Sequence, residues 1–168
     1  MSDNKKNSPM WSTVFSRGEE RGGVVARLRR VPVFTGLARR EIAMLAEISH
    51  RRTYEPGEYI FRKGQPGAAM FVVNRGLVRI FDNDPDGSEV ELALVGEEGF
   101  FGELALLDDS ARSASARAER PSELYAFFRV DLEKFLAGMP QAGLQVYRGL
   151  AHVIGERLRA TNVQLLNG

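Results

Sequence analysis

The sequence predicts a mainly β protein, an antiparallel barrel or sandwich with a jelly roll as the expected closed form, flanked by helices. Between Tyr54 and Val130 apolar and polar residues alternate, as they do in half-buried strands. Turns that contain Gly or Pro interrupt this alternation every eight to twelve residues, which is typical of an all-β barrel or sandwich. Outside this region apolar residues recur at intervals of three and four, which indicates amphipathic helices.

Composition and charge narrow the class of protein. The chain has 168 residues, enough for about one domain with a substantial core, and its formal net charge is +1. This balance predicts neither nucleic-acid binding nor attachment to a membrane surface. The absence of cysteine excludes disulfides, thiol nucleophiles and thiolate metal sites. Because no apolar run is long enough for a secretion signal or a membrane span, we expect a cytoplasmic protein.

A tail and two short helices precede the strands. Residues 1–23 are polar and predict a flexible tail, in which Trp11 and Phe15 would share one face of a small amphipathic turn. A first helix then runs until Pro32, and the stretch REIAMLAEI predicts a second one. The apolar positions of the two helices are Val24, Val25, Leu28 and Val31 in the first and Ile42, Leu45 and Ile48 in the second.

The predicted strands follow as short apolar segments. They are EYIF, AMFVVN, GLVRIF, VELALV, SASARA and LYAFF, and the turns between them include KGQPG, NDPDGS and GEEG. The stretch VDLEKFL predicts a helix that ends at residues 138–140, and a last helix continues almost to the C-terminus. The chain is therefore expected to comprise a tail (1–23), a strand domain with flanking helices (24–140) and a C-terminal helix (141–168).

The last helix has the clearest periodicity in the chain. Its apolar stripe repeats at intervals of three and four, as in the seam of a heptad repeat. The stripe is Leu144, Tyr147, Ala151, Ile154, Leu158, Thr161 and Leu165. It would either rest on the domain's own barrel or form a homodimer, parallel or antiparallel. Thr161 is polar, so at a seam position it would either fix the register or contact a ligand.

The segment FFGELALLDDSARSAS combines a glycine, a carboxylate and a guanidinium. Gly102 lies where a strand or loop becomes a short helix, whose first amides have no partners within the helix and attract an anion. A glycine there lets the backbone approach an oxygen closely. Arg112, nine residues after Glu103, would supply planar donors suited to two phosphate oxygens. Together these groups predict a site for a singly charged phosphodiester.

Glu103 indicates what adjoins that phosphate. An ionised carboxylate only accepts hydrogen bonds, so beside a phosphate it would bind a neighbouring sugar hydroxyl. A phosphate with an adjacent ribose hydroxyl at the mouth of a barrel describes a cyclic nucleotide. A nucleoside triphosphate would require a GxxxxGK[ST] loop, which the sequence lacks. His50 and His152 are too few and too far apart to predict a metal site, and no catalytic motif is present.

The segment FFGELALLDDSARSASARAE resembles the phosphate-binding cassette of cyclic nucleotide-binding domains, and the resemblance extends over residues 28–162. It implies an eight-stranded antiparallel jelly-roll β-barrel with short N-terminal helices and C-terminal helices, the last of which acts as a lid. By resemblance, the ligand-binding residues are Gly102, Glu103, Leu104, Ala105, Arg112, Ser113 and Ala114. Leu92 would form part of the wall near the base. Thr161 and Asn162 match lid residues that contact adenine in the catabolite activator group.

The expected function is regulatory rather than enzymatic. The resemblance implies a sensor of a cyclic nucleotide that signals through its cassette and last helix. Cyclic AMP is expected as the ligand, and cyclic GMP is the alternative because the Ser113 hydroxyl could contact the amino group of guanine. No other cofactor and no metal are expected. Because the chain stops at Gly168, we expect a stand-alone module, a homodimer through its last helix, without a DNA-reading helix-turn-helix. A protein effector would be the partner. The seven arginines within residues 27–52 would either bind an acidic partner or form a solvated helical face. The alternatives are a DNA-binding regulator whose reader lies elsewhere, or an interaction scaffold that binds no nucleotide.

Overall fold

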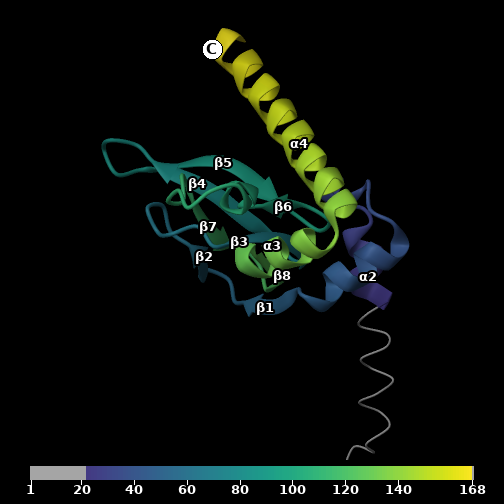
Figure 1. Cartoon of the computed structure of the whole chain (residues 1–168). Coiled ribbons are helices and arrows are strands. Elements are labelled where there is room, and N and C mark those ends of the chain that lie inside the picture. The colour runs from purple at the N-terminus through teal and green to yellow at the C-terminus, as the bar shows by residue number, and fades with distance from the viewer. Residues whose placement is uncertain (1–21, 168) are drawn as a thin grey trace, which may run out of the picture.

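The structure is a computed structural model that describes residues 22–167. Its centre is a jelly roll of two four-stranded antiparallel sheets, in the orders β1-β8-β3-β6 and β2-β7-β4-β5 (Figure 1). The strands are β1 (His50–Tyr54), β2 (Tyr59–Phe61), β3 (Ala69–Arg75), β4 (Val78–Asn83), β5 (Glu89–Val95), β6 (Phe100–Phe101), β7 (Ser115–Ala118) and β8 (Ser122–Phe128). The predicted fold class and its eight strands are therefore confirmed.

Helices lie before, within and after the strands. Residues 22–28 are helical. The other helices are the 3₁₀ turn η1 (Pro32–Phe34), α2 (Arg39–Glu47), the 3₁₀ turn η2 (Glu103–Leu106), α3 (Arg129–Gly138) and α4 (Pro140–Asn167). The last helix begins at Pro140 rather than at residue 141, because proline is well suited to the first turn of a helix. Residues 22 and 23, which the sequence pattern assigns to the tail, are helical. In an α-helix the carbonyls of the first residues accept hydrogen bonds from amides four residues later, so the helix that contains Val24 includes the two residues before it. The rest of the predicted tail, with Trp11 and Phe15, lies outside the described residues.

The sequence pattern missed two strands, β1 and β6. Strand β1, with the sequence HRRTY, has four exposed residues and no apolar alternation. Within residues 22–167 it pairs with β8 alone and lies at the edge of its sheet. Strand β6 has only two residues and pairs with β3. Alternating hydrophobicity detects a strand with one buried face, and neither strand provides such a pattern over four residues or more.

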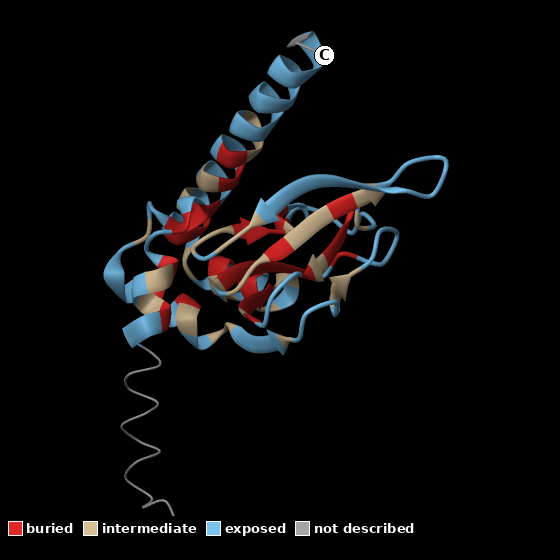
Figure 2. Ribbon diagram, turned by 180° about the vertical axis from the view of Figure 1, so that it is seen from behind, coloured by how far each residue is buried: buried red, intermediate tan, exposed pale blue. Residues whose placement is uncertain are grey.

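Two apolar layers stabilise the fold. The first lies between the sheets and includes Phe71, Val73, Phe101, Ala116 and Leu124. The second lies between the β1-β8-β3-β6 sheet and the helices, and includes Leu28, Phe34, Leu45, Phe127, Leu136, Val146 and Leu150. Figure 2 shows that burial on α4 is confined to its first half, whereas its second half, strand β5 and the loop between β4 and β5 are mostly exposed. The exposed half of α4 and strand β5 border a cavity.

Candidate functional site

A cavity of about 560 Å³ lies among η2, the following loop, β5 and the second half of α4. Most of the residues predicted to bind a ligand line it: Leu92, Gly102, Glu103, Leu104, Ala105, Arg112, Ser113, Ala114 and Thr161. Asn162 does not line it, because successive residues of a helix point about 100° apart and Thr161 faces the cavity. The structure thus brings together segments from three distant parts of the chain.

Gly102 makes the turn into η2. Its φ of 74° lies in the left-handed region, which glycine adopts without steric cost. A Cβ atom at this position would lie 2.8 Å from Nη1 of Arg112 and 3.2 Å from the carbonyl oxygen of Ala69. Glycine therefore serves two purposes here, since it permits the turn and leaves room for the guanidinium beside it.

Arg112 is held from several sides. Its Nη2 donates to the carbonyl of Ala69 at 2.7 Å and its Nη1 to the carbonyl of Gly102 at 3.3 Å. The guanidinium carbon lies 4.0 Å from the centre of the Phe61 ring. Burial lowers the pKa of the guanidinium, and the nearby Glu103 carboxylate opposes this effect. Because arginine is protonated under nearly all conditions in proteins, the group remains a cation.

The backbone around Arg112 is anchored as well. Its amide donates to the carbonyl of Gln65 and its carbonyl accepts from the amide of Gly64, both at 2.8 Å. The Nε atom of Arg112, in contrast, is buried and has no hydrogen-bond partner among the described residues. A buried donor without an acceptor is costly by about 1–3 kcal/mol. An anionic oxygen in the cavity would remove this cost.

Glu103 is a buried carboxylate, with 3% of its surface exposed. Its Oε1 atom accepts a hydrogen bond from Nη1 of Arg157 on α4. Its Oε2 atom is buried and has no partner among residues 22–167. The carboxylate therefore has one oxygen paired with a cation and one oxygen that lacks a donor, which a hydroxyl group would supply.

Arg157 is the residue that sequence reasoning missed. Besides Glu103 it contacts the carbonyl of Phe100 at 3.2 Å, and its guanidinium carbon lies 5.0 Å from the Phe100 ring. A second stripe on α4 faces the domain and consists of Ala142, Val146, Leu150, Val153, Arg157, Ala160 and Gln164. Its polar members interrupt a helical apolar pattern, and this interruption is the signal that would have identified Arg157.

Most of the predicted heptad stripe faces away from the domain, whereas its member Thr161 lines the cavity. Leu144, Leu158 and Leu165 are 51%, 60% and 76% exposed. The first alternative, that this stripe rests on the domain's own barrel, is therefore wrong for these leucines, because the second stripe of α4 already occupies that position. Thr161 donates to the carbonyl of Arg157 at 3.0 Å, within its own helix.

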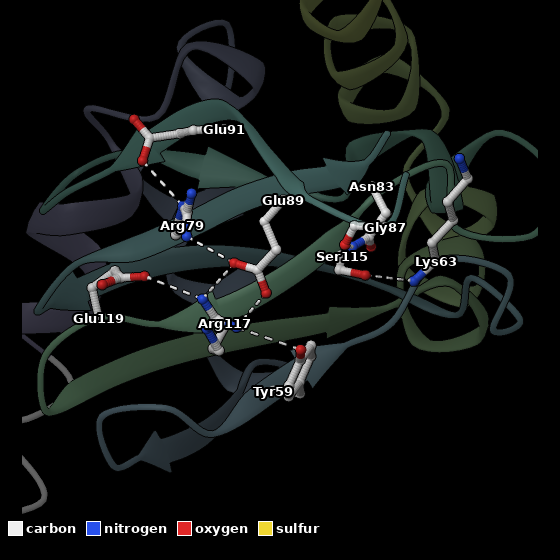
Figure 3. Close-up of polar contacts among 10 residues, drawn as sticks. All are labelled: Tyr59, Lys63, Arg79, Asn83, Gly87, Glu89, Glu91, Ser115, Arg117 and Glu119. Atoms are coloured by element: carbon white, nitrogen blue, oxygen red, sulfur yellow. Dashed lines mark hydrogen bonds and ion pairs between the residues drawn. The ribbon is translucent and has the colours of Figure 1, made fainter. Parts of the chain in front are cut away.

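The wall formed by β5 is held from the opposite face of its sheet. Arg117 on β7 donates to both carboxylate oxygens of Glu89 at 2.8 and 2.9 Å, and Arg79 on β4 contacts Glu89 and Glu91 (Figure 3). The bond from Arg117 lowers the pKa of the Glu89 carboxyl. These contacts join the edge strand β5 to its neighbour β4 and to β7 beyond it, and β5 in turn places Leu92 in the cavity wall.

Two other classes of site are absent from residues 22–167. No group of three or more His, Asp or Glu side chains is arranged to hold a metal ion. None of the helices in this part of the chain is both long enough and apolar enough to cross a bilayer.

Comparisons with known proteins agree on one family. The model of the cyclic nucleotide-binding domain matches residues 51–138. The cyclic AMP receptor protein of Thermus thermophilus is 39% identical over 134 residues, which are 80% of this chain and 60% of that protein. A CRP-like cAMP-activated global transcriptional regulator of Mycobacterium tuberculosis is 30% identical over 138 residues, 82% of this chain and 60% of that protein. This chain thus spans about 60% of the length of these relatives.

Among solved structures, the N-terminal domain of a transcriptional regulator from Streptomyces coelicolor A3(2) superposes with a TM-score of 0.72 at 34% identity. The match covers 81% of this chain and 94% of that domain.

Proposed function

This chain belongs to the cyclic nucleotide-binding domain family, and on that premise we propose that its cavity binds a 3′,5′-cyclic nucleotide, with cyclic AMP as the expected ligand. One observation carries the proposal. Two residues that line the cavity each have a buried polar atom without a partner among residues 22–167: the acceptor Oε2 of Glu103 and the donor Nε of Arg112. A ligand that satisfies both must present a hydroxyl group next to an anionic oxygen. The ribose 2′-hydroxyl and the cyclic phosphate of such a nucleotide have this arrangement.

The roles of the cavity residues follow from this pose. Arg112 would pair with the single negative charge of the phosphate, which the backbone at Gly102 and Ala105 also approaches. Glu103 would accept the 2′-hydroxyl proton through Oε2 while Arg157 holds Oε1 and offsets the charge of the carboxylate. Leu92 and Thr161 would lie near the base.

Signalling would proceed through α4. Arg157, Ala160, Thr161 and Gln164 line the cavity, so a ligand there contacts the helix directly. The same helix exposes the stripe that contains Leu144 and Leu158 on its other side. We propose that this stripe pairs with a second copy, and that nucleotide binding changes the orientation of α4 and thereby the surface offered to a protein effector. The chain would act by binding, without catalysis.

A thermal-shift panel tests the proposal. Cyclic AMP, cyclic GMP and adenosine would be added to the purified chain at equal concentrations. A ligand at about 100 times its Kd stabilises the folded state by about 2.7 kcal/mol, so at least one cyclic nucleotide should raise the Tm while adenosine does not. If no cyclic nucleotide raises the Tm, the chain is an interaction scaffold of the same fold.

A second candidate is a sensor that controls transcription. The superposition on the N-terminal domain of a transcriptional regulator favours it, because that match covers 94% of the regulator domain. DNA binding would then reside outside these 168 residues. Measuring DNA binding by the product of the complete reading frame, with and without cyclic AMP, distinguishes this candidate from a module that acts only on proteins.

A further inference from the structure

A second hollow, of about 860 Å³, shares no residue with the ligand cavity. It is lined by residues of the helix 22–28, of α2 and of strands β1, β3 and β8. Its apolar lining comprises Val24, Val25, Ala43, Ala46 and Tyr125. We refer to this surface as the N-terminal groove. The proposed nucleotide function makes no use of it.

The chain itself supplies a segment at the edge of the groove. Gly23 is one of the lining residues, and 21 residues precede the described part of the chain. Their last part, residues 10–21, reads MWSTVFSRGEER and contains the apolar residues Met10, Trp11, Val14 and Phe15. Phe15 is seven residues from Gly22, and an extended chain of that length spans about 23–25 Å. Such a reach allows the segment to turn back onto the groove from which it emerges.

Both parts carry charges of both signs. Within residues 22–167, the groove residues Glu47 and Arg75 take part in no ion pair. The segment carries two arginines and two glutamates, at positions 17, 19, 20 and 21. A segment with both signs of charge can therefore pair with either side of the groove while its aromatic residues cover the apolar lining.

We propose that residues 10–21 dock in the N-terminal groove of the same molecule, with the side chains of Trp11 and Phe15 against Val24, Val25 and Ala46. Each aromatic side chain can bury about 150–250 Å² of surface, which is the driving force for docking. The groove is formed partly by the helix of residues 22–28, so the docked segment holds this helix against the back of the β1-β8-β3-β6 sheet.

Tryptophan fluorescence tests the proposal, because the chain has a single tryptophan, Trp11. In the wild-type chain we expect a blue-shifted emission and weaker acrylamide quenching than in a peptide of residues 1–21. The variant Ala46→Glu places a charge in the groove at a half-buried position of α2, where Glu keeps a good helix propensity, and should return both signals to those of the peptide. The matched control Met44→Glu changes the same helix at a residue that does not line the groove, and should leave both signals at wild-type values.

A second measurement does not depend on the folding of a groove variant. In the double variant Trp11→Ala/Phe15→Ala, hydrogen exchange at residues 43–47 should be at least several times faster than in wild type, with no change at residues 78–83 of β4. The proposal is overturned if Trp11 in wild type is as exposed as in the peptide, or if Ala46→Glu and Met44→Glu behave alike. A fluorescence signal that disappears on dilution also overturns it, because the segment would then occupy the groove of another molecule.

Discussion

Replacing Arg112 by alanine should weaken nucleotide binding more than any other single truncation in the cavity. The guanidinium is partly buried, lines the cavity and has a buried Nε atom without an acceptor among the described residues. Removing one partner of a buried, hydrogen-bonded charge pair costs about 2–5 kcal/mol, because the other charge remains desolvated and unpaired. This corresponds to a Kd that is about 30-fold to several thousand-fold higher.

The free protein should be affected too, and the assay must separate the two effects. Arg112→Ala also removes the bonds to the carbonyls of Ala69 and Gly102, each worth about 1.5–3 kcal/mol because the donor is charged. Isothermal titration calorimetry should therefore be accompanied by denaturant unfolding, at a temperature where the variant is fully folded. Arg112→Lys keeps the charge without the planar fork and should give an intermediate loss.

Arg120→Ala is the matched control, because Arg120 is an exposed arginine in the loop between β7 and β8. It should leave the Kd unchanged. If folded Arg112→Ala binds cyclic nucleotide within about threefold of wild type, a difference below 1 kcal/mol, the pairing of this arginine with the phosphate is refuted.

Three further predictions concern the sugar contact, the cassette turn and the β5 wall. A 2′-deoxy cyclic nucleotide should bind wild type about 10- to 150-fold more weakly, the value of a hydrogen bond to a charged group, and Glu103→Gln should reduce this penalty in a calorimetric double-mutant cycle. Gly102→Ala should destabilise the fold by about 1–3 kcal/mol in denaturant unfolding, since alanine at a φ of 74° is strained and its Cβ would crowd Arg112. Arg117 lowers the pKa of the Glu89 carboxyl, so this carboxyl stabilises the fold above its unfolded pKa of about 4.3. The stabilisation is lost as the pH falls through the lower pKa of the folded state. In Arg117→Gln, stability should therefore fall less steeply as the pH is lowered through the acid range.

Each of these predictions has an outcome that contradicts it. An equal 2′-deoxy penalty in wild type and in Glu103→Gln would show that the hydroxyl does not contact this carboxylate. A Gly102→Ala variant as stable as wild type would mean that the turn can relax without cost. A stability that falls as steeply with decreasing pH in Arg117→Gln as in wild type would show that Glu89 makes no measurable contribution to stability.

The cassette could be predicted from the sequence because its parts are close along the chain. Gly102, Glu103 and Arg112 lie within eleven residues, so their types and spacing alone indicate a site for a phosphate and a hydroxyl. The strands that contain alternating residues were equally accessible, since period-two hydrophobicity reflects one buried face.

Contacts between distant segments could not be predicted in the same way. Arg157 and Glu103 are 54 residues apart, and only the packing of α4 against the domain brings them together. The same packing decides which of the two apolar stripes of α4 is buried. Strand β1 was missed because strand pairing with β8, rather than its own residues HRRTY, makes it a strand.

The central claim is that the cavity between the cassette and α4 binds a cyclic phosphodiester next to a ribose hydroxyl. The most direct test is calorimetric titration of the wild-type chain with 3′,5′-cyclic AMP, 3′,5′-cyclic GMP and 5′-AMP. We expect saturable binding of at least one cyclic nucleotide at one site per chain, about tenfold or more tighter than 5′-AMP, whose second phosphate charge has no partner beside Arg112. Absence of binding by both cyclic nucleotides, or equal affinity for 5′-AMP, would contradict the claim.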